Sequence, residues 1–198
     1  MIPIDLLLAF GAKEKTYPKG TVLFNERQPA RFYYQVENGE VKTRNLNADG
    51  KEFIQGIFTT GDSFGESTLF NGKKYPVEAI TMTDATIYVQ PKSAFLNMLQ
   101  KSPQTAISLC ARLANRLYYK TMIAAEIASH DPEHRLLKLI DFLKTDVGNC
   151  ELGELYQVSL TRQQLADLTG LRVETVIRTI KALEKKGVLS VKKRKIYR

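Results

Sequence analysis

The first half of the chain alternates short runs of aromatic and β-branched residues with turn residues. Four such runs span positions 21–24, 32–36, 41–46 and 53–58. Glycines at positions 39, 50, 61 and 72 recur every eleven residues, three of them in Asn-Gly or Asp-Gly pairs that favour tight hairpins. Short strands at this spacing predict a compact antiparallel β-roll over about residues 16–90.

A helical pattern replaces the strand pattern near residue 91. Ser102-Pro103 is typical of a helix start, and the segment 103–129 contains no glycine and no further proline. Alternating spacings of three and four place Lys120 and several apolar residues on one face, as in a coiled-coil seam. A helix packed on its own domain would show the same pattern. The seam predicts a dimer interface made by Cys110, Leu113, Leu117, Ala124 and Ile127.

Start and stop signals further on predict a helix-turn-helix. Asp131 can cap a helix whose first residue is Pro132. Thr161 and Gln164 have the spacing of a capping box, and the short helix that follows would end at Gly170. Glycine permits the left-handed turn that joins the two helices of this motif.

The second helix of the pair is predicted to begin at Arg172 or Val173 and to have one apolar and one charged face. At about 100° per residue, the charged face carries Glu174, Arg178, Lys181 and Lys185, and the apolar face carries Val173, Val176, Ile180 and Leu183. Arginine can contact guanine and a carboxylate can accept from cytosine, whereas lysines mainly hold phosphates. A solvated helix face would carry a similar stripe, so the prediction depends on the order of all these motifs.

Positive charge accumulates toward the C-terminus. The formal net charge is +8, and residues 131–198 hold 14 basic and 9 acidic side chains, a net +5. A solvated tail would explain the charge alone, but two short predicted strands flank the basic turn 192–194, which would suit a phosphate backbone. We therefore predict contacts with double-stranded DNA from Thr161, Arg162, Gln163, Arg172, Glu174, Thr175, Arg178, Lys181, Lys192, Lys193 and Arg194.

Three motifs in this order resemble the cyclic-AMP receptor/fumarate–nitrate regulator (CRP/FNR) superfamily. The stretch Gly61-Asp62-Ser63-Phe64-Gly65-Glu66 is similar to the family's Gly-Asp-x-Phe-Gly-Glu motif, and segments 161–166 and 174–178 resemble its two DNA-binding helices. The resemblance implies an α+β protein: an effector-sensing, jelly-roll-like β-roll of the cyclic-nucleotide-binding type (1–101), a dimerisation helix (102–130) and a winged helix-turn-helix (131–198). It also implies a bacterial homodimeric transcription regulator on a palindromic operator, with RNA polymerase a candidate partner.

In that family an effector binds between the roll and the dimer helix. The resemblance implies a candidate effector pocket formed by Gly65, Glu66, Ser67, Lys73, Lys74, Tyr75, Lys120 and Thr121. The stretch 71–77 is shorter than in cyclic-AMP binders and lacks their arginine, so the expected effector is a small anion other than cyclic AMP. The lysines could equally be charges at a turn tip, and Lys120 could lay its stem along the seam. The family's cysteine cluster and a roll histidine are absent, so neither an iron–sulfur cluster nor haem is expected.

Two other functions stay open on the sequence alone. An effector-independent DNA-binding protein could keep the roll only as a packing or partner-binding module, and a small-barrel metalloenzyme is a more remote alternative. His130 and His134 have metal-ligand spacing, but Pro132 lies between them, so we predict no metal site and no catalytic residues. No long apolar segment or signal peptide is recognised, which predicts a cytoplasmic protein without a membrane partner.

Overall fold

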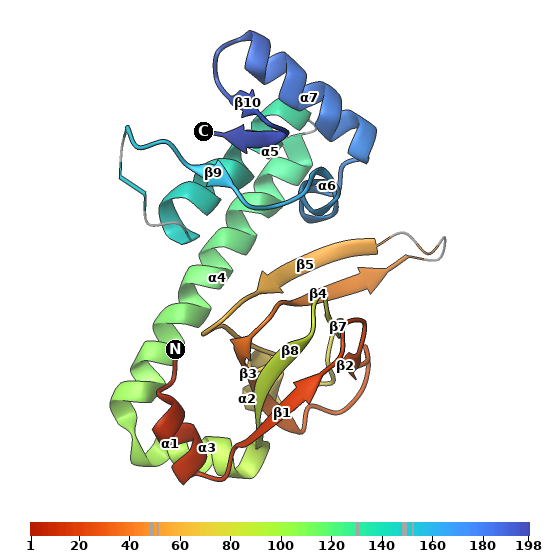
Figure 1. Ribbon diagram of the computed structural model, residues 1–198. Helices are drawn as coiled ribbons and strands as arrows, with labels where there is room; N and C mark the ends of the chain where they lie inside the picture. The colour runs from red at the N-terminus through yellow and green to blue at the C-terminus, as the bar shows by residue number, and fades with distance from the viewer. Residues whose placement is uncertain (48–49, 51, 130, 148–149, 152) are drawn as a thin grey trace. The chain divides into compact units, whose positions relative to one another are not determined.

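The computed structural model describes residues 1–47, 50, 52–129, 131–147, 150–151 and 153–198, which form two compact units (Figure 1). The first unit is Met1–Ala114 and the second is Asn115–Arg198, so the division falls inside the long helix α4 (Pro103–Ser129). Before α4, the first unit contains α1 (Ile4–Ala9), β1 (Lys13–Tyr17), β2 (Val22–Phe24), β3 (Phe32–Asn38), β4 (Val41–Leu46), β5 (Glu52–Phe58), β6 (Ser63–Phe64), α2 (Ser67–Asn71), β7 (Glu78–Thr81), β8 (Ala85–Pro91) and α3 (Lys92–Lys101).

The strands of the first unit form two four-stranded antiparallel sheets. Their orders are β1-β8-β3-β6 and β2-β7-β4-β5. One core of buried residues joins the two sheets, with Tyr34 and Ile87 from the first and Val41 and Ala79 from the second. The predicted antiparallel roll is confirmed, and the four runs that suggested it are β2, β3, β4 and β5.

The strand β3 is buried on both faces. Its inner face contributes Tyr34 to the roll core, whereas its outer face contributes Tyr33 to a second core with α1, α3 and the start of α4. Gln35 is also buried, and its amide exchanges hydrogen bonds with the backbone N–H (3.1 Å) and carbonyl (2.9 Å) of Ile2. A buried amide needs such partners, so Gln35 fixes the first residues of the chain against the sheet.

The beginning of α4 belongs to the first unit. Leu109 is buried in the outer core, and Leu113 packs against the same core. The guanidinium of Arg112 donates to the carbonyl of Gly61 (3.1 Å) and lies 3.4 Å from a carboxylate oxygen of Asp62. These contacts attach the helix to the turn that precedes β6.

The second unit is built from helices and a small sheet. After α4 it contains α5 (Pro132–Phe142), a π-helical turn η1 (Leu143–Val147), β9 (Gln157–Val158), α6 (Arg162–Thr169), α7 (Val173–Lys185), β10 (Ser190–Lys192) and β11 (Lys195–Tyr197). Asp131 caps α5, as predicted, by accepting from the N–H of Glu133 (2.9 Å). The small sheet has the order β10-β11-β9, and the pattern of the sequence does not predict its third strand.

Two arginines hold the second unit together. Arg135 is buried in α5 and donates to the carbonyl of Thr169 (3.0 Å), which ties α5 to the end of α6. Arg198 makes two hydrogen bonds to the carboxylate of Asp141, of 2.7 and 3.3 Å, and so ties the C-terminal residue to α5. In the part of the chain that the structure describes, no helix is long and apolar enough to cross a membrane.

Candidate nucleic-acid interface and roll cleft

The α6–turn–α7 unit has the predicted local chemistry. The Thr161 hydroxyl accepts from the N–H of Gln164 (3.1 Å), and the Gln164 side chain accepts from the N–H of Thr161 (2.7 Å). This reciprocal pair satisfies two donors at the helix start. Gly170 has φ +69°, the left-handed conformation that ends α6 and redirects the chain into α7.

Helix α7 has the two faces that the sequence predicts. Val176, Ile180 and Leu183 are buried, and Val173 is half-buried. The opposite face is exposed along its length, with Glu174, Arg178, Lys181 and Lys185. Among the described residues, none makes a hydrogen bond or ion pair with the side chains of these four. Their charged groups are therefore free to contact a ligand.

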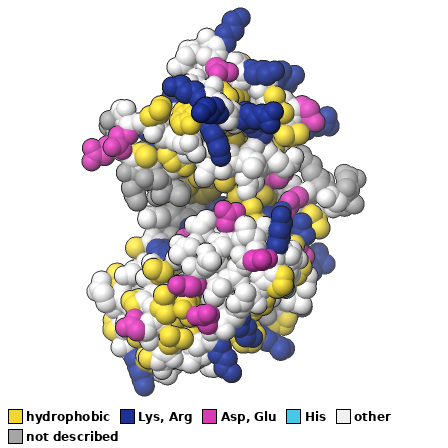
Figure 2. Space-filling model, in the orientation of Figure 1, with side chains coloured by type: hydrophobic (Ala, Val, Ile, Leu, Met, Phe, Trp, Pro, Cys, Tyr) yellow, Lys and Arg dark blue, Asp and Glu magenta, His cyan; other side chains and the backbone are white. Residues whose placement is uncertain are grey.

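The turn between β10 and β11 carries exposed positive charge. Lys193 and Arg194 form the turn with φ +47° and +65°, as in a two-residue hairpin, and Lys192 is the last residue of β10. All three side chains are exposed. Figure 2 shows Lys and Arg side chains gathered over the part of the second unit that contains α7 and this turn. Clustered cations of this kind favour a polyanionic partner.

Other predicted DNA contacts have different surroundings. Arg172 is exposed at the start of α7, and Thr175 is half-buried one turn along. Gln163 is exposed but donates to Asp167 (2.8 Å). Arg162 is half-buried and donates to the carbonyl of Arg194 (3.2 Å). It therefore supports the turn 192–194 between β10 and β11, called the wing turn below. Support of the turn is a role that the sequence pattern does not reveal.

Within the first unit, the predicted effector residues differ in burial. Glu66 is buried and accepts from the Ser63 hydroxyl (3.0 Å), whereas Ser67, Lys73 and Lys74 are exposed. Lys120 and Thr121 belong to the second unit. Lys73 and Lys74 therefore lie at a surface turn next to Gly72, in agreement with the alternative that they are charges at a turn tip.

Gly65 and Tyr75 do lie close together. A β-carbon on Gly65 would be 3.2 Å from the rings of both Phe24 and Tyr75, which themselves stack at 3.7 Å. Across the described residues of the first unit, Glu66 is the only buried side chain that carries a charge. This interior thus offers no buried cation to a phosphate group.

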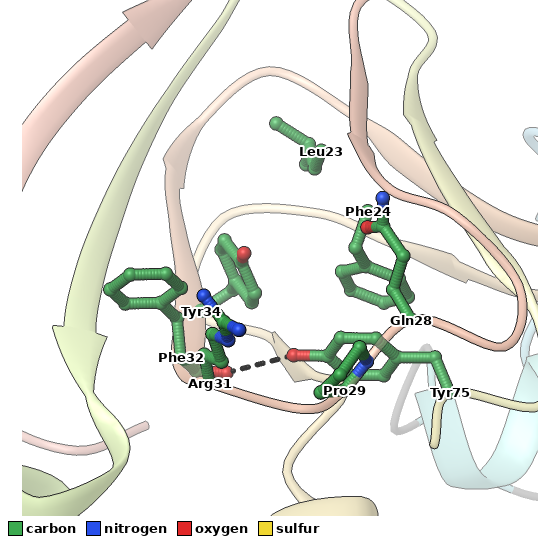
Figure 3. A pocket seen from close by; sticks show the side chains of 8 residues that line it. All are labelled: Leu23, Phe24, Gln28, Pro29, Arg31, Phe32, Tyr34 and Tyr75. Carbon is green, nitrogen blue, oxygen red and sulfur yellow. Dashed lines mark hydrogen bonds between the residues drawn. The ribbon is translucent and has the colours of Figure 1, made fainter.

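A cleft of about 320 Å³ opens on the roll at a place that the sequence does not predict (Figure 3). It is lined by Leu23, Phe24, Gln28, Pro29, Arg31, Phe32, Tyr34 and Tyr75. Burial raises the pKa of Tyr75 to about 12 and also raises that of Tyr34, so both phenols stay protonated. Of the predicted effector residues, Tyr75 alone lines this cleft.

The predicted dimer face of α4 is partly free. Cys110, Leu117 and Ala124 are exposed, whereas Leu113 is half-buried against the roll's outer core. The side chain of Ile127 lies outside the residues whose side chains are described. The sequence pattern does not single out Ile107 or Tyr118, which are exposed by 61% and 65% and share a helix face about a quarter turn from Leu117.

No metal centre is found where the structure can be described. Within those residues, no group of three or more His, Cys, Asp or Glu side chains is placed to hold a metal ion. The two cysteines, Cys110 and Cys150, are not joined in a disulfide.

Comparisons with known proteins cover both units. Residues 14–102 match the model of the cyclic nucleotide-binding domain, and residues 134–197 match that of the Crp-like helix-turn-helix domain. The cyclic AMP receptor protein of Thermus thermophilus is 27% identical over 190 residues, which cover 94% of this chain and 83% of that protein. The probable transcriptional regulator flp of Lacticaseibacillus casei is 30% identical over 176 residues, which cover 89% of this chain and 78% of that protein.

A solved structure has the same architecture. The c-di-GMP responsive global regulator CLP of Xanthomonas campestris is similar with a TM-score of 0.75 and 25% identity, over 98% of this chain and 96% of that one. The two domain matches, the relatives and this structure agree with the roll, the long helix and the helix-turn-helix described above. The chain belongs to the CRP/FNR family of transcription regulators.

Proposed function

We propose that the chain acts as a homodimer that binds an imperfect palindrome in double-stranded DNA and regulates transcription there. The observation that carries this proposal is the exposed face of α7, where charged side chains lie free of partners among the described residues. A helix with such a face fits the major groove, and the basic wing turn fits the adjacent phosphates. The function is regulatory rather than catalytic, in the cytoplasm, with RNA polymerase a candidate partner.

The residues of α7 divide between base contacts and phosphate contacts. Arg178 has the planar donors that suit the N7 and O6 acceptors of guanine, and Glu174 can accept from the amino group of cytosine. Lys181 and Lys185 are compact charges at the far end of the helix and suit phosphates. Arg172 and Thr175 flank the base-contacting pair at the start of α7.

The remaining predicted contacts position the protein on the DNA backbone. Lys192, Lys193 and Arg194 contact phosphates through the wing, and Thr161 and Gln163 lie at the start of α6. Arg162 contributes by holding the wing turn through the carbonyl of Arg194. Phosphate contacts set register and affinity, so sequence preference comes from α7.

Dimerisation is proposed along α4. Its exposed apolar side chains include Ile107, Cys110, Leu117 and Ala124, which follow one another at spacings of three, seven and seven residues, and Tyr118 beside Leu117. Large apolar side chains at such spacing on an exposed helix face favour a helix–helix interface. If two copies of the chain pair along α4 about a two-fold axis, the dimer has two copies of α7, one for each half-site of the palindrome.

Control by a small effector is proposed, and the effector is not a cyclic nucleotide held through its phosphate. Relatives named for cyclic AMP and for a c-di-GMP response support effector control. In this chain Glu66 has no buried cation near it among the described roll residues, and Tyr75 fills space beside Gly65. The same packing favours a second candidate function, an effector-independent regulator.

The experiment that tests DNA binding is selection of duplexes from a random library by the purified chain. We expect an enriched palindrome whose half-sites lie about 34 Å, or about 10 base pairs, apart. No retention of any duplex at low ionic strength would contradict the proposal. Thermal unfolding with a panel of small anions separates the effector alternatives: a true ligand at about one hundred times its Kd adds about 2.7 kcal/mol of stability, whereas an effector-independent regulator gains nothing from any of them. We expect no such gain from cyclic AMP.

A further inference from the structure

The cleft lined by Arg31 and its neighbours, called the Arg31 cleft below, has the composition of a ligand site. Its volume of about 320 Å³ is at the lower end of the range for small-molecule sites. It shares Tyr75 with the effector site that the family resemblance implies, but neither Glu66 nor any residue of α4 lines it. Both sides of the cleft belong to the first unit.

The floor of the Arg31 cleft is aromatic. Phe24 stacks on Tyr75 with ring centroids 3.7 Å apart and lies 5.6 Å from the ring of Tyr34. At the rim, Phe32 is 39% exposed and meets Tyr34 edge-on at 6.4 Å. A planar ring in the cleft would pack against these faces and cover the exposed part of Phe32, since aromatic pairs favour stacked and edge-on contacts.

The polar groups of the cleft are mainly donors. Arg31 is exposed, and no described residue makes a hydrogen bond or ion pair with its guanidinium. Tyr34 is only 5% exposed, yet its hydroxyl has no hydrogen-bond partner among the described residues. Gln28 uses its side-chain oxygen to accept from the N–H of Asn25 (3.0 Å), which leaves its amide N–H groups as donors.

The carboxylate nearest in sequence is already engaged. Glu26 lies 3.8 Å from Arg27 and accepts from the side-chain amide of Asn45 (3.1 Å). Its carboxylate therefore has partners other than Arg31. A guanidinium, a phenol and an amide around an aromatic floor are complementary to a flat ligand that brings acceptors and negative charge.

We propose that the Arg31 cleft binds a small planar aromatic carboxylate, with the carboxylate on Arg31 and the ring on the aromatic floor. The proposal goes beyond DNA binding and does not depend on it. Its failure would leave the proposed regulatory function intact, and a chain that ignored DNA could still bind such a ligand here.

The test is isothermal titration calorimetry of the full chain with para-hydroxybenzoate. Two matched probes separate the contributions: para-hydroxybenzamide keeps the ring without the charge, and cyclohexanecarboxylate keeps the charge without the aromatic ring. We expect saturable binding of para-hydroxybenzoate and binding weaker by about tenfold or more for both other probes, because each loses one class of contact.

Two variants in the cleft and one control outside it locate the binding. Arg31→Gln should weaken para-hydroxybenzoate by about tenfold or more, whereas Arg27→Gln, an exposed arginine outside the cleft, should change it less than about twofold. Tyr34→Phe keeps the ring, and with it the packing of the roll, and should weaken binding by about twofold to tenfold.

Three outcomes would overturn the proposal. The first is no saturable binding at millimolar probe. The second is equal binding of the charged and neutral aromatic probes. The third is an unchanged Kd in Arg31→Gln, or equal loss in Arg31→Gln and Arg27→Gln, which would mean that general surface charge attracts the anion.

Discussion

Arg178 lies in the middle of the charged face of α7, with Glu174 one turn before it. Replacing Arg178 with alanine should cost about 1–3 kcal/mol on the selected operator and relax the preference at one base pair, because a bidentate contact to guanine is lost. The side chain is exposed, so the fold should not change. Titration against the operator and its single-base variants measures both effects.

The control for this prediction is Lys138→Ala, which removes an exposed charge from α5. It should leave the base preference as it was. If Arg178→Ala weakened binding equally on every DNA sequence, Arg178 would contact only the DNA backbone.

A substitution of Lys193 tests whether the wing turn contacts phosphates. Its φ of +47° is tolerated by asparagine, so Lys193→Asn removes the charge with little backbone strain. We expect a similar loss on all duplexes and a decrease of about one in the slope of log K against log salt, since one phosphate contact disappears. Lys193→Arg should keep the slope, and an unchanged slope in Lys193→Asn would remove the wing from the interface.

At the scale of the element, the hairpin between β3 and β4 depends on Gly39. A β-carbon there would lie 2.4 Å from the carbonyl oxygen of Asp84 and 2.8 Å from the Cα of Ala85, at φ +89°. Gly20 has a similar φ of +81°, but nothing lies within 4 Å of an added β-carbon. The two glycines thus separate steric clash from backbone strain.

Alanine at Gly20 should cost about 1–2 kcal/mol of unfolding free energy through strain alone. Alanine at Gly39 should cost about 1–3 kcal/mol more, because the backbone around Ala85 must move. Urea unfolding of both variants measures the difference. Equal unfolding midpoints would show that the contact at Asp84 does not constrain the hairpin.

The sequence predicted the elements whose patterns are local. Helix α7 has a clear apolar period, and Thr161, Gln164 and Gly170 mark both ends of α6. Strand β8 was missed as a separate element because it is buried on both faces and shows no alternation of apolar and polar residues. Strand β9 has two residues and exists only through its pairing with β11, so no local signal could mark it.

At the scale of the whole molecule, folding brings together residues that are far apart in the sequence, and the sequence could not predict the surfaces that they form. The Arg31 cleft combines residues 23–34 with Tyr75, which meet because the backbone N–H of Tyr75 donates to the carbonyl of Gln28 (2.9 Å). The spacing of residues along the chain does not predict such a contact. By contrast, the charged face of α7 was predicted residue by residue, since one helix contains it.

Dimer formation is a prediction at this scale. Leu117 is 68% exposed in the single chain, so Leu117→Asp should leave the fold intact and lower the dimer's stability by placing a charge in an apolar contact. Sedimentation velocity should show monomer at concentrations where the parent chain is dimeric. Asn115→Asp adds the same charge away from the apolar stripe and should remain dimeric; equal dissociation of the two variants, or of neither, would contradict the interface.

The central claim is that two copies of α7 contact two half-sites at once, in successive major grooves of one face of the DNA. The measurement is the affinity for the selected palindrome against the same half-sites separated by five additional base pairs, which rotates one of them by about half a helical turn. The account predicts that affinity falls to that of unrelated DNA at the same salt concentration. Equal affinity for both duplexes would contradict it.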